Sequence, residues 1–189
     1  SLPQLVTSVS AADFNRDGVA DIVTGAGGGP RVRVFDGTNA RLLFDFAAYD
    51  SSFTGGVFVA AGDVTGDGIP DIVTGAGPGG GPTVRVFDGR DARRVLSISA
   101  FDASFDGGVS VATGNFDGDK YADIVIGAGP GGGPHVRILS GNDAHLIGNF
   151  FAFDRTYTGG VLVTHAADLS GDGISDVIVS TASGDAISK

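Results

Sequence analysis

Several residue types are missing from this chain of 189 residues, and each absence excludes a class of protein. There is no cysteine, so a disulfide framework and a cysteine-bound zinc site are both excluded. All 22 acidic residues are Asp, which leaves the chain without Glu, a good helix former. The same absence removes the most usual acid of glycosidases, although Asp can replace it. The composition therefore argues against helices.

Basic residues and long apolar runs are also scarce. The 12 Lys and Arg residues are outnumbered by Asp, and the formal net charge is −10. Clusters of Lys and Arg bind nucleic acids and anionic membranes, so we expect neither as a partner. No apolar stretch approaches the ~20 residues of a membrane span, and the first residues do not resemble a signal peptide. A signal peptide could have been removed, or the chain could be an excerpt of a longer one.

Glycine is abundant, at 33 residues, and most glycines cluster between segments rich in Val, Ile, Phe and Thr. This pattern predicts short strands joined by tight turns. One unit occurs four times, and its clearest segments begin 50, 52 and 53 residues apart, at Asp13, Asp63, Asn115 and Asp168. A repeat of about 50 residues is typical of propellers and solenoids.

Each complete unit predicts four strands, which in the second copy lie at residues 56–63, 71–74, 83–87 and 95–101. Four antiparallel strands of this length form one blade of a β-propeller. We therefore predict an all-β chain of about three and a half blades, because the fourth unit stops after its second strand. The chain is expected to be a single repeat domain over residues 1–189, with units at approximately 5–50, 51–102, 103–154 and 155–189. A propeller ring typically needs 4 to 8 blades, so this array is expected to be incomplete or to associate.

Antiparallel order also predicts which loops lie together. The acidic loop and the turn at Asp88 and Gly89 should share one end of a blade, and the glycine run and the inter-unit loop should share the other. Arg33, Arg85 and Arg137 recur at intervals of 52 in the third strand of each unit. We expect them to be structural, either solvated or paired with Asp. The alternative is that they bind an anionic ligand.

The four acidic loops carry oxygen-bearing side chains at positions 1, 3, 5 and 9. They are DFNRDGVAD, DVTGDGIPD, NFDGDKYAD and DLSGDGISD. Calcium takes six to eight oxygen ligands at about 2.3 to 2.6 Å, and a short loop supplies them by alternating ligands with spacers. Position 7 is apolar or aromatic, so it would contribute its backbone carbonyl while its side chain points into the blade. The predicted ligands are Asp13, Asn15, Asp17, Val19, Asp21, Asp63, Thr65, Asp67, Ile69, Asp71, Asn115, Asp117, Asp119, Tyr121, Asp123, Asp168, Ser170, Asp172, Ile174 and Asp176.

These loops are not EF-hands, because the bidentate Glu at position 12 is missing and the flanking segments are strand-like. Glycine at position 6 permits a sharp turn in three loops, and Lys120 replaces it in the third, which should weaken that site. The plainer interpretation is that Asp and Gly simply favour turns. It explains one loop better than four loops in the same register. Up to four Ca²⁺ ions are therefore expected, and they would bring the formal charge from −10 to −2.

The repeated unit, for example GDVTGDGIPDIVTGAGPGGGPTVRVFDG, resembles the FG-GAP or VCBS repeats of integrin α-subunit propellers and of many secreted bacterial proteins. The resemblance covers nearly the whole chain. It implies that the acidic loop joins the first two strands of a blade and holds calcium. It also implies a secreted or cell-surface protein of bacterial type, in a family that serves adhesion, lectin-like binding and non-catalytic parts of enzymes.

Two classes of function follow from the sequence. The first is a calcium-stabilised module for adhesion or for binding an extracellular protein or glycan; the second is the propeller part of a calcium-dependent enzyme that degrades polysaccharides. We favour the first and expect no catalytic residue, since His135, His145 and His165 lie apart and no nucleophile motif occurs. The GxGxxG matches are followed by strands, which argues against a nucleotide site. Candidate ligand-binding residues at the tips of the inter-unit loops are Phe53, Phe105 and Tyr157.

Overall fold

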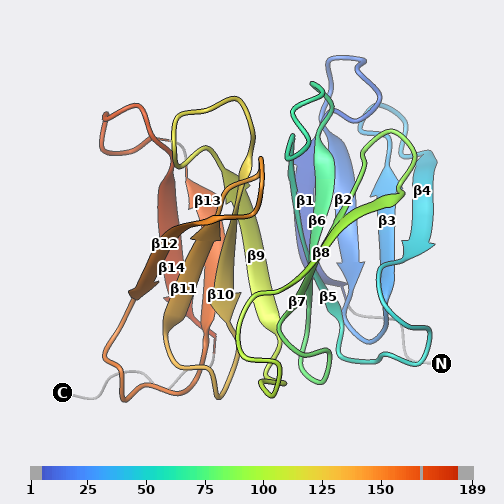
Figure 1. Ribbon diagram of the computed structural model, residues 1–189. Helices are drawn as coiled ribbons and strands as arrows, with labels where there is room; N and C mark the ends of the chain where they lie inside the picture. The colour runs from blue at the N-terminus through green and yellow to red at the C-terminus, as the bar shows by residue number, and fades with distance from the viewer. Residues whose placement is uncertain (1–5, 167, 183–189) are drawn as a thin grey trace.

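The computed structural model describes residues 6–166 and 168–182, and this part of the chain consists of strands and loops without a helix (Figure 1). The predicted all-β class is therefore confirmed. The strands are β1 (Val6–Ala12), β2 (Asp21–Ala26), β3 (Arg31–Phe35), β4 (Leu42–Ala47), β5 (Val57–Gly62), β6 (Asp71–Ala76), β7 (Thr83–Phe87), β8 (Arg94–Ser99), β9 (Val109–Gly114), β10 (Asp123–Ala128), β11 (His135–Leu139), β12 (Leu146–Phe151), β13 (Val161–Ala166) and β14 (Asp176–Thr181).

The strands form four antiparallel sheets in chain order. Three sheets have four strands, in the orders β1-β2-β3-β4, β5-β6-β7-β8 and β9-β10-β11-β12, and the last sheet pairs β13 with β14. These are propeller-like blades, three complete and one half, as the repeat predicts. The innermost strands of successive blades are neighbours, since β1 contacts β5, β5 contacts β9 and β9 contacts β13.

The antiparallel pairing places the loops at two opposite ends of each blade, as predicted. At one end the acidic loop meets the turn between the third and fourth strands, where Gly37 N–H donates to Asp21 Oδ1 at 3.0 Å. At the other end the glycine run meets the inter-unit loop, where Gly77 N–H donates to the carbonyl of Gly56 at 2.9 Å. Each of the three complete blades therefore presents one acidic end and one glycine-rich end.

The hydrophobic core lies between blades, in three separate layers. Within the second strand of a blade, the first two apolar residues face opposite neighbours: Ile72 packs against the first blade and Val73 packs against the third. The strands β6 and β10 are buried along their whole length because a blade covers each of their faces. The nearly continuous apolar runs of these strands follow from this double coverage.

Hydroxyl side chains of the innermost strands join neighbouring blades. Ser8 Oγ lies 3.1 Å from the carbonyl of Val59, and Ser110 Oγ lies 3.0 Å from the carbonyl of Val161. Thr113 Oγ1 donates to the carbonyl of Ala61 at 2.8 Å. These bonds satisfy backbone groups at the axis of the array, where no strand ladder runs from one blade to the next.

The repeated arginines also connect blades. Arg85 Nη1 donates to the carbonyl of Ala48 at 2.7 Å, with its guanidinium over the ring of Tyr49. Arg137 repeats this arrangement one blade later, on the carbonyl of Ala100. Arg33 instead pairs with Asp45 of its own blade, with Nε 3.3 Å from Oδ2. The arginines thus have the structural role that the sequence favoured, but only Arg33 pairs with Asp as expected, and Arg85 and Arg137 bond to backbone carbonyls instead.

Candidate metal centres

Each acidic loop is anchored by the Asp at position 9, which begins the second strand of its blade. Asp21, Asp71 and Asp123 are fully buried. One carboxylate oxygen of each accepts backbone N–H groups from the start of its own loop, for example from Thr65 to Asp71 at 2.7 Å. The other oxygen accepts the glycine N–H of the neighbouring turn, as from Gly141 to Asp123 at 3.0 Å. The carboxylate therefore fixes the loop against the turn.

The buried carboxylates of Asp71 and Asp123 carry an electrostatic cost. Burial raises the pKa of Asp71, against backbone hydrogen bonds from Thr65 and Gly89 that lower it, and the nearby charge of Asp67 raises it further. Burial also raises the pKa of Asp123, to which the charges of Asp117 and Asp119 add. Because burial and like charge both disfavour the ionised form, a bound cation would stabilise these loops.

Position 1 closes the loop in the first, second and fourth copies. Asp63 accepts the N–H groups of Asp67 at 3.0 Å and Gly68 at 2.8 Å, and Asp13 and Asp168 accept the equivalent pairs. Gly68, at position 6, has a φ of 83°, a left-handed value that explains the repeated glycine. In all four loops Oδ1 of the position 5 Asp accepts the N–H of position 7, which leaves Oδ2 for another partner.

The third loop has a different shape. Lys120 at position 6 does not adopt the left-handed backbone, and Asn115 Oδ1 accepts the N–H of Gly118 at 2.8 Å instead of those of positions 5 and 6. In this loop the carboxylates of Asp117, Asp119 and Asp123 each offer an oxygen within 4.8 Å of the others. Whether Lys120 weakens calcium binding stays a prediction, but the three carboxylates do converge.

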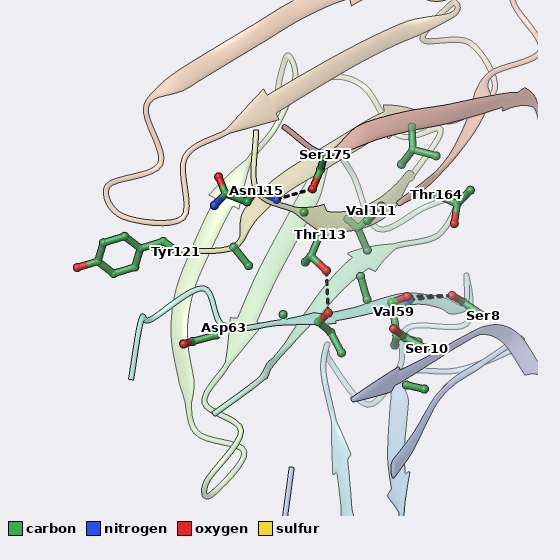
Figure 2. Close-up of a pocket in the computed structure, with 18 of the residues that line it drawn as sticks. Ser8, Ser10, Val59, Asp63, Val111, Thr113, Asn115, Tyr121, Thr164 and Ser175 are labelled. Carbon is green, nitrogen blue, oxygen red and sulfur yellow. Dashed lines mark hydrogen bonds between the residues drawn. The ribbon is translucent and has the colours of Figure 1, made fainter. Parts of the chain in front are cut away.

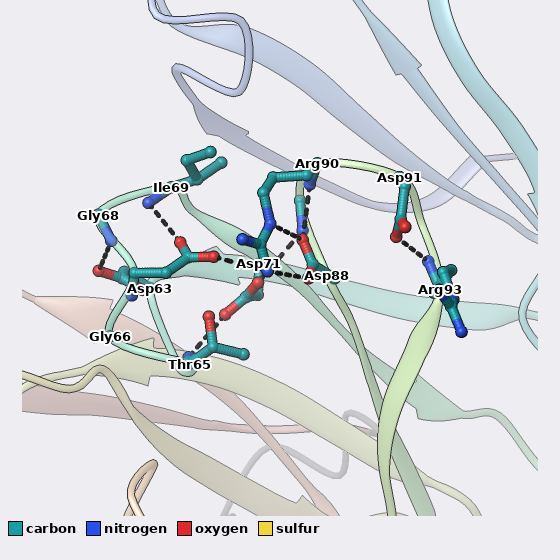
Figure 3. Close-up of polar contacts among 12 residues, drawn as sticks. Asp63, Thr65, Gly66, Gly68, Ile69, Asp71, Asp88, Arg90, Asp91 and Arg93 are labelled. Carbon is teal, nitrogen blue, oxygen red and sulfur yellow. Dashed lines mark hydrogen bonds and ion pairs between the residues drawn. The ribbon is translucent and has the colours of Figure 1, made fainter.

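The second loop contains two features that bear on a cation (Figure 3). Thr65 Oγ1 is buried and has no hydrogen-bond partner. The guanidinium of Arg90, from the turn between β7 and β8, lies between Asp67 and Asp88, with Nη2 3.1 Å and 2.6 Å from their Oδ2 atoms. Arg90 is not among the residues that the sequence pattern predicts for this site. Its position could have indicated this role, because Arg90 follows Asp88 and Gly89 in a turn predicted to lie beside the acidic loop.

At position 7, the side chains of Val19 and Tyr121 do not point into their own blade. Val19 is 41% exposed, so that expectation is wrong for the first loop. A Cβ atom added to Gly66 would lie 2.4 Å from the ring of Tyr121, which shows that Tyr121 covers the loop of the preceding blade. The buried side chain of the loop stands at position 2, where Phe14 and Val64 pack into the core that their blade shares with the next one. Val19 is exposed because no described blade precedes the first one.

The predicted ligand-binding tips lie at the opposite end of the blades. Phe53, Phe105 and Tyr157 are half-buried, and each ring packs edge-on against an aromatic residue four positions earlier, at centroid distances of 5.4, 6.0 and 6.2 Å. A cavity of about 450 Å³ beside Phe53 is also lined by Ser52 and Arg85. The rings therefore anchor the inter-unit loops, and their contact with a ligand stays a prediction.

A second cavity, of about 500 Å³, lies between the innermost strands (Figure 2). Asp63, Asn115, Tyr121 and Ser175 line it together with residues of β1, β5, β9 and β13, so it borders the acidic loops. Its polar groups are largely engaged: Thr113 bonds to the carbonyl of Ala61, and Ser175 Oγ accepts the N–H of Asn115 at 3.1 Å. The cavity is therefore the space between the innermost strands along the axis of the array, and the hydroxyl groups that line it form hydrogen bonds between blades.

Comparison with known proteins agrees with this architecture. A crystal structure of a protein of unknown function from Bacteroides caccae superposes with a TM-score of 0.54 at 12% sequence identity, covering 96% of this chain and 54% of that one. The chain thus spans about half the length of that structure, and the likeness concerns the fold alone. A search of curated protein sequences finds no match. None of the described residues forms a helix with the length and hydropathy needed to cross a membrane.

The family comparison covers most of the chain. The model described as FG-GAP repeat matches residues 5–40, 55–90 and 107–164. These segments contain the first three acidic loops and the strands beside them. FG-GAP repeats form β-propeller-like modules and are typical of extracellular proteins, which agrees with the blades described above. This chain belongs to the FG-GAP repeat family.

Proposed function

We propose that this FG-GAP module binds calcium at its acidic loops, with up to one ion in each. The ligands would be the side-chain oxygens at positions 1, 3, 5 and 9 and the carbonyl at position 7, an oxygen-only set that suits Ca²⁺. The ion would supply positive charge where carboxylates of one loop face one another, and it would hold the loop in a single shape. The calcium would thus be structural, and no chemical step is assigned to it.

The convergence of Asp117, Asp119 and Asp123 within 4.8 Å is the observation that carries this proposal. Thr65 Oγ1, at a predicted ligand position of the second loop, is buried near Asp71 and makes no hydrogen bond of normal geometry with the described residues, which supports the proposal. Coordination to a cation would satisfy this oxygen. Burial raises the pKa of Asp71 and the charge of Asp67 adds to that shift, and a bound cation would offset both effects.

The experiment is calorimetric titration with CaCl₂ beside thermal unfolding in calcium and in chelator. Extracellular calcium modules bind at roughly 10⁻⁴ to 10⁻³ M, so binding should be measurable at millimolar calcium. At ten times the dissociation constant each independent site adds about 1.4 kcal/mol to the free energy of unfolding, and chelation should lower the melting temperature. Magnesium serves as the control ion, because it demands a tighter octahedral geometry. No heat and no shift at millimolar calcium would overturn the proposal.

We propose further that the module is extracellular, secreted or cell-surface, and serves adhesion or the binding of a protein or glycan without catalysis. Two histidines have packing or surface roles that support this: His135 stacks on Phe151 at 4.7 Å, and His145 pairs with Asp143 on the exposed surface. The inter-unit loops vary in sequence on a repeated scaffold, which is where specificity can reside without disturbing the fold.

A glycan array with the calcium-loaded protein tests this role, with a polysaccharide depolymerisation assay beside it. Binding without depolymerisation is expected. Depolymerisation by the purified chain would favour the propeller of a polysaccharide-degrading enzyme instead. If a ligand is found, replacing Phe53, Phe105 and Tyr157 together by Ser should reduce its affinity; unchanged affinity in the folded, calcium-loaded protein would exclude these tips.

A further inference from the structure

The second acidic loop has a charged neighbour on the oxygen that calcium would need. Asp67 Oδ1 accepts the N–H of Ile69 at 2.8 Å, so Oδ2 is the oxygen left for a cation. Arg90 Nη2 lies 3.1 Å from this Oδ2 (Figure 3). The free oxygen of a central predicted calcium ligand is therefore already in an ion pair.

Asp88 holds Arg90 in this place from the other side. Its Oδ1 accepts a hydrogen bond from Arg90 Nε at 2.9 Å, and its Oδ2 accepts one from Nη2 at 2.6 Å. This two-point contact fixes the plane of the guanidinium. Asp88 itself is buried, and its backbone closes the turn through hydrogen bonds with Arg93 and Ala92. Arg90 is thus positioned by its own turn and would stay beside the loop even without Asp67.

The other blades carry a neutral residue at this point. Thr38 stands at the equivalent position of the first blade, with Oγ1 3.4 Å from Asp17 Oδ2, and Asn142 stands there in the third blade. The first and second loops both have Asp at positions 1, 5 and 9. They therefore share their carboxylates, and only in the second loop does the neighbouring turn present a charge to position 5. Arg16, at position 4 of the first loop, reaches toward Gly68 of the second, so its charge lies between the two loops.

We propose that Arg90 is an internal counter-ion of the second loop, which competes with calcium for Asp67 and makes this loop bind calcium more weakly than the first. The inference rests on the proposed calcium binding. To bind a divalent ion, Asp67 Oδ2 would have to give up its contact with the guanidinium, while Arg90 would keep its pair with Asp88. The positive charge of Arg90 would then repel the ion, which would lower the affinity. In the absence of calcium, Arg90 stabilises the loop that it otherwise weakens as a metal site.

The test follows the two loops separately by NMR during a calcium titration of the whole chain. The amides of Gly18 and Gly68 suit this purpose, because they bond to the position 1 carboxylates of Asp13 and Asp63. The Gly68 amide should respond at higher calcium than the Gly18 amide. Arg90→Thr, which copies the first blade, should lower the Gly68 midpoint by about three- to tenfold and leave the Gly18 midpoint unchanged.

Arg93→Thr is the matched control, since it removes the same formal charge from the same turn, where Arg93 is exposed and only its backbone forms hydrogen bonds with the described residues. It should leave both midpoints nearly unchanged, and Arg90→Lys should fall between wild type and Arg90→Thr because it keeps the charge without the two-point fork. In chelator, Arg90→Thr should melt at a lower temperature than wild type, and saturating calcium should reduce that difference.

The outcomes separate the two proposals. If both loops respond to calcium but Arg90→Thr leaves the Gly68 midpoint in place, or shifts it no more than Arg93→Thr does, then the role of Arg90 is wrong and calcium binding stands. If neither amide responds at millimolar calcium, calcium binding at these two loops is itself wrong, and the counter-ion role is wrong with it.

Discussion

The inner blades and the end blades are built from the same repeated residues, yet their surroundings differ completely. Ile72 of β6 is 0% exposed, whereas Ile22, at the same position of β2, is 44% exposed. On the innermost strands, Val59 is 3% exposed and its counterpart Val9 is 61% exposed. The repeat therefore specifies which face each side chain takes, and the neighbouring blade decides whether that face is buried.

The repeated arginines show the same contrast. Arg85 reaches the preceding blade and caps the carbonyl of Ala48, whereas Arg33, with no described blade before it, turns to Asp45 of its own sheet. The arginine that joins two blades inside the array thus forms a surface ion pair within its own blade at the end of the array. Equal residues at equal positions are expected to contribute unequally to stability, which can be measured by paired substitutions.

The largest difference should appear in the core between blades. Ile72→Ala removes a fully buried side chain and should lower the free energy of unfolding by about 2 to 5 kcal/mol. Ile22→Ala, the matched control on the exposed face of the first blade, should cost only a small part of that. Chemical denaturation of both variants in the same buffer gives the comparison. Equal losses would mean that the outer face of the first blade is covered in solution.

Much of this architecture could be predicted from the sequence, because each copy of the repeat can be checked against the others. Four copies in one register indicate strands and loops more firmly than any single segment does, and antiparallel order alone places the acidic loop beside the turn at Asp88. The strand boundaries were less sharp: the strand predicted at 71–74 continues to Ala76, and the one predicted at 95–101 ends at Ser99.

What the sequence could not supply are contacts between different copies of the repeat. In the third loop the ring of Tyr121, at position 7, covers Gly66 of the preceding blade, and no spacing within one unit indicates that neighbour. Arg90 could not be predicted from the repeat for a related reason. Thr38 in the first blade and Asn142 in the third occupy the equivalent turn position, so Arg90 is not part of the repeat. The recurring residues define the scaffold, and the residues that differ among copies change the surroundings of individual loops.

A second, smaller difference is expected for the arginines. Arg85→Ala leaves the carbonyl of Ala48 without its charged donor and should lower the free energy of unfolding by about 1.5 to 3 kcal/mol. Arg137→Ala should behave alike, since Arg137 makes the same bond to Ala100. Arg33→Ala should change the free energy of unfolding very little, as is typical of an exposed ion pair. A loss in Arg33→Ala as large as in Arg85→Ala would contradict the assignment of these bonds to the joints between blades.

The smallest difference concerns the acidic loops, which are tied from blade to blade through their backbones. Ala122 N–H, at position 8 of the third loop, donates to the carbonyl of Asp63 at 2.8 Å, and Ser175 N–H donates to the carbonyl of Asn115 at 2.9 Å. In the second loop this position is Pro70, which has no N–H to offer Asp13. The first and second loops therefore lack the bond that joins the later ones.

Ala122→Pro should remove the tie between the second and third loops while keeping a backbone that Pro70 already adopts at the same position. The carbonyl of Asp63 loses its partner, so the free energy of unfolding should fall by about 1 to 2 kcal/mol in calorimetry or denaturant titration. Ala20→Pro is the matched control, because the N–H of Ala20 has no partner among the described residues. The control also measures what proline contributes by restricting the unfolded chain, a gain of about 0.4 to 1 kcal/mol where its conformation fits. The loss in Ala122→Pro relative to Ala20→Pro therefore isolates the bond between loops, and no difference between the two variants would mean that the acidic loops are thermodynamically independent.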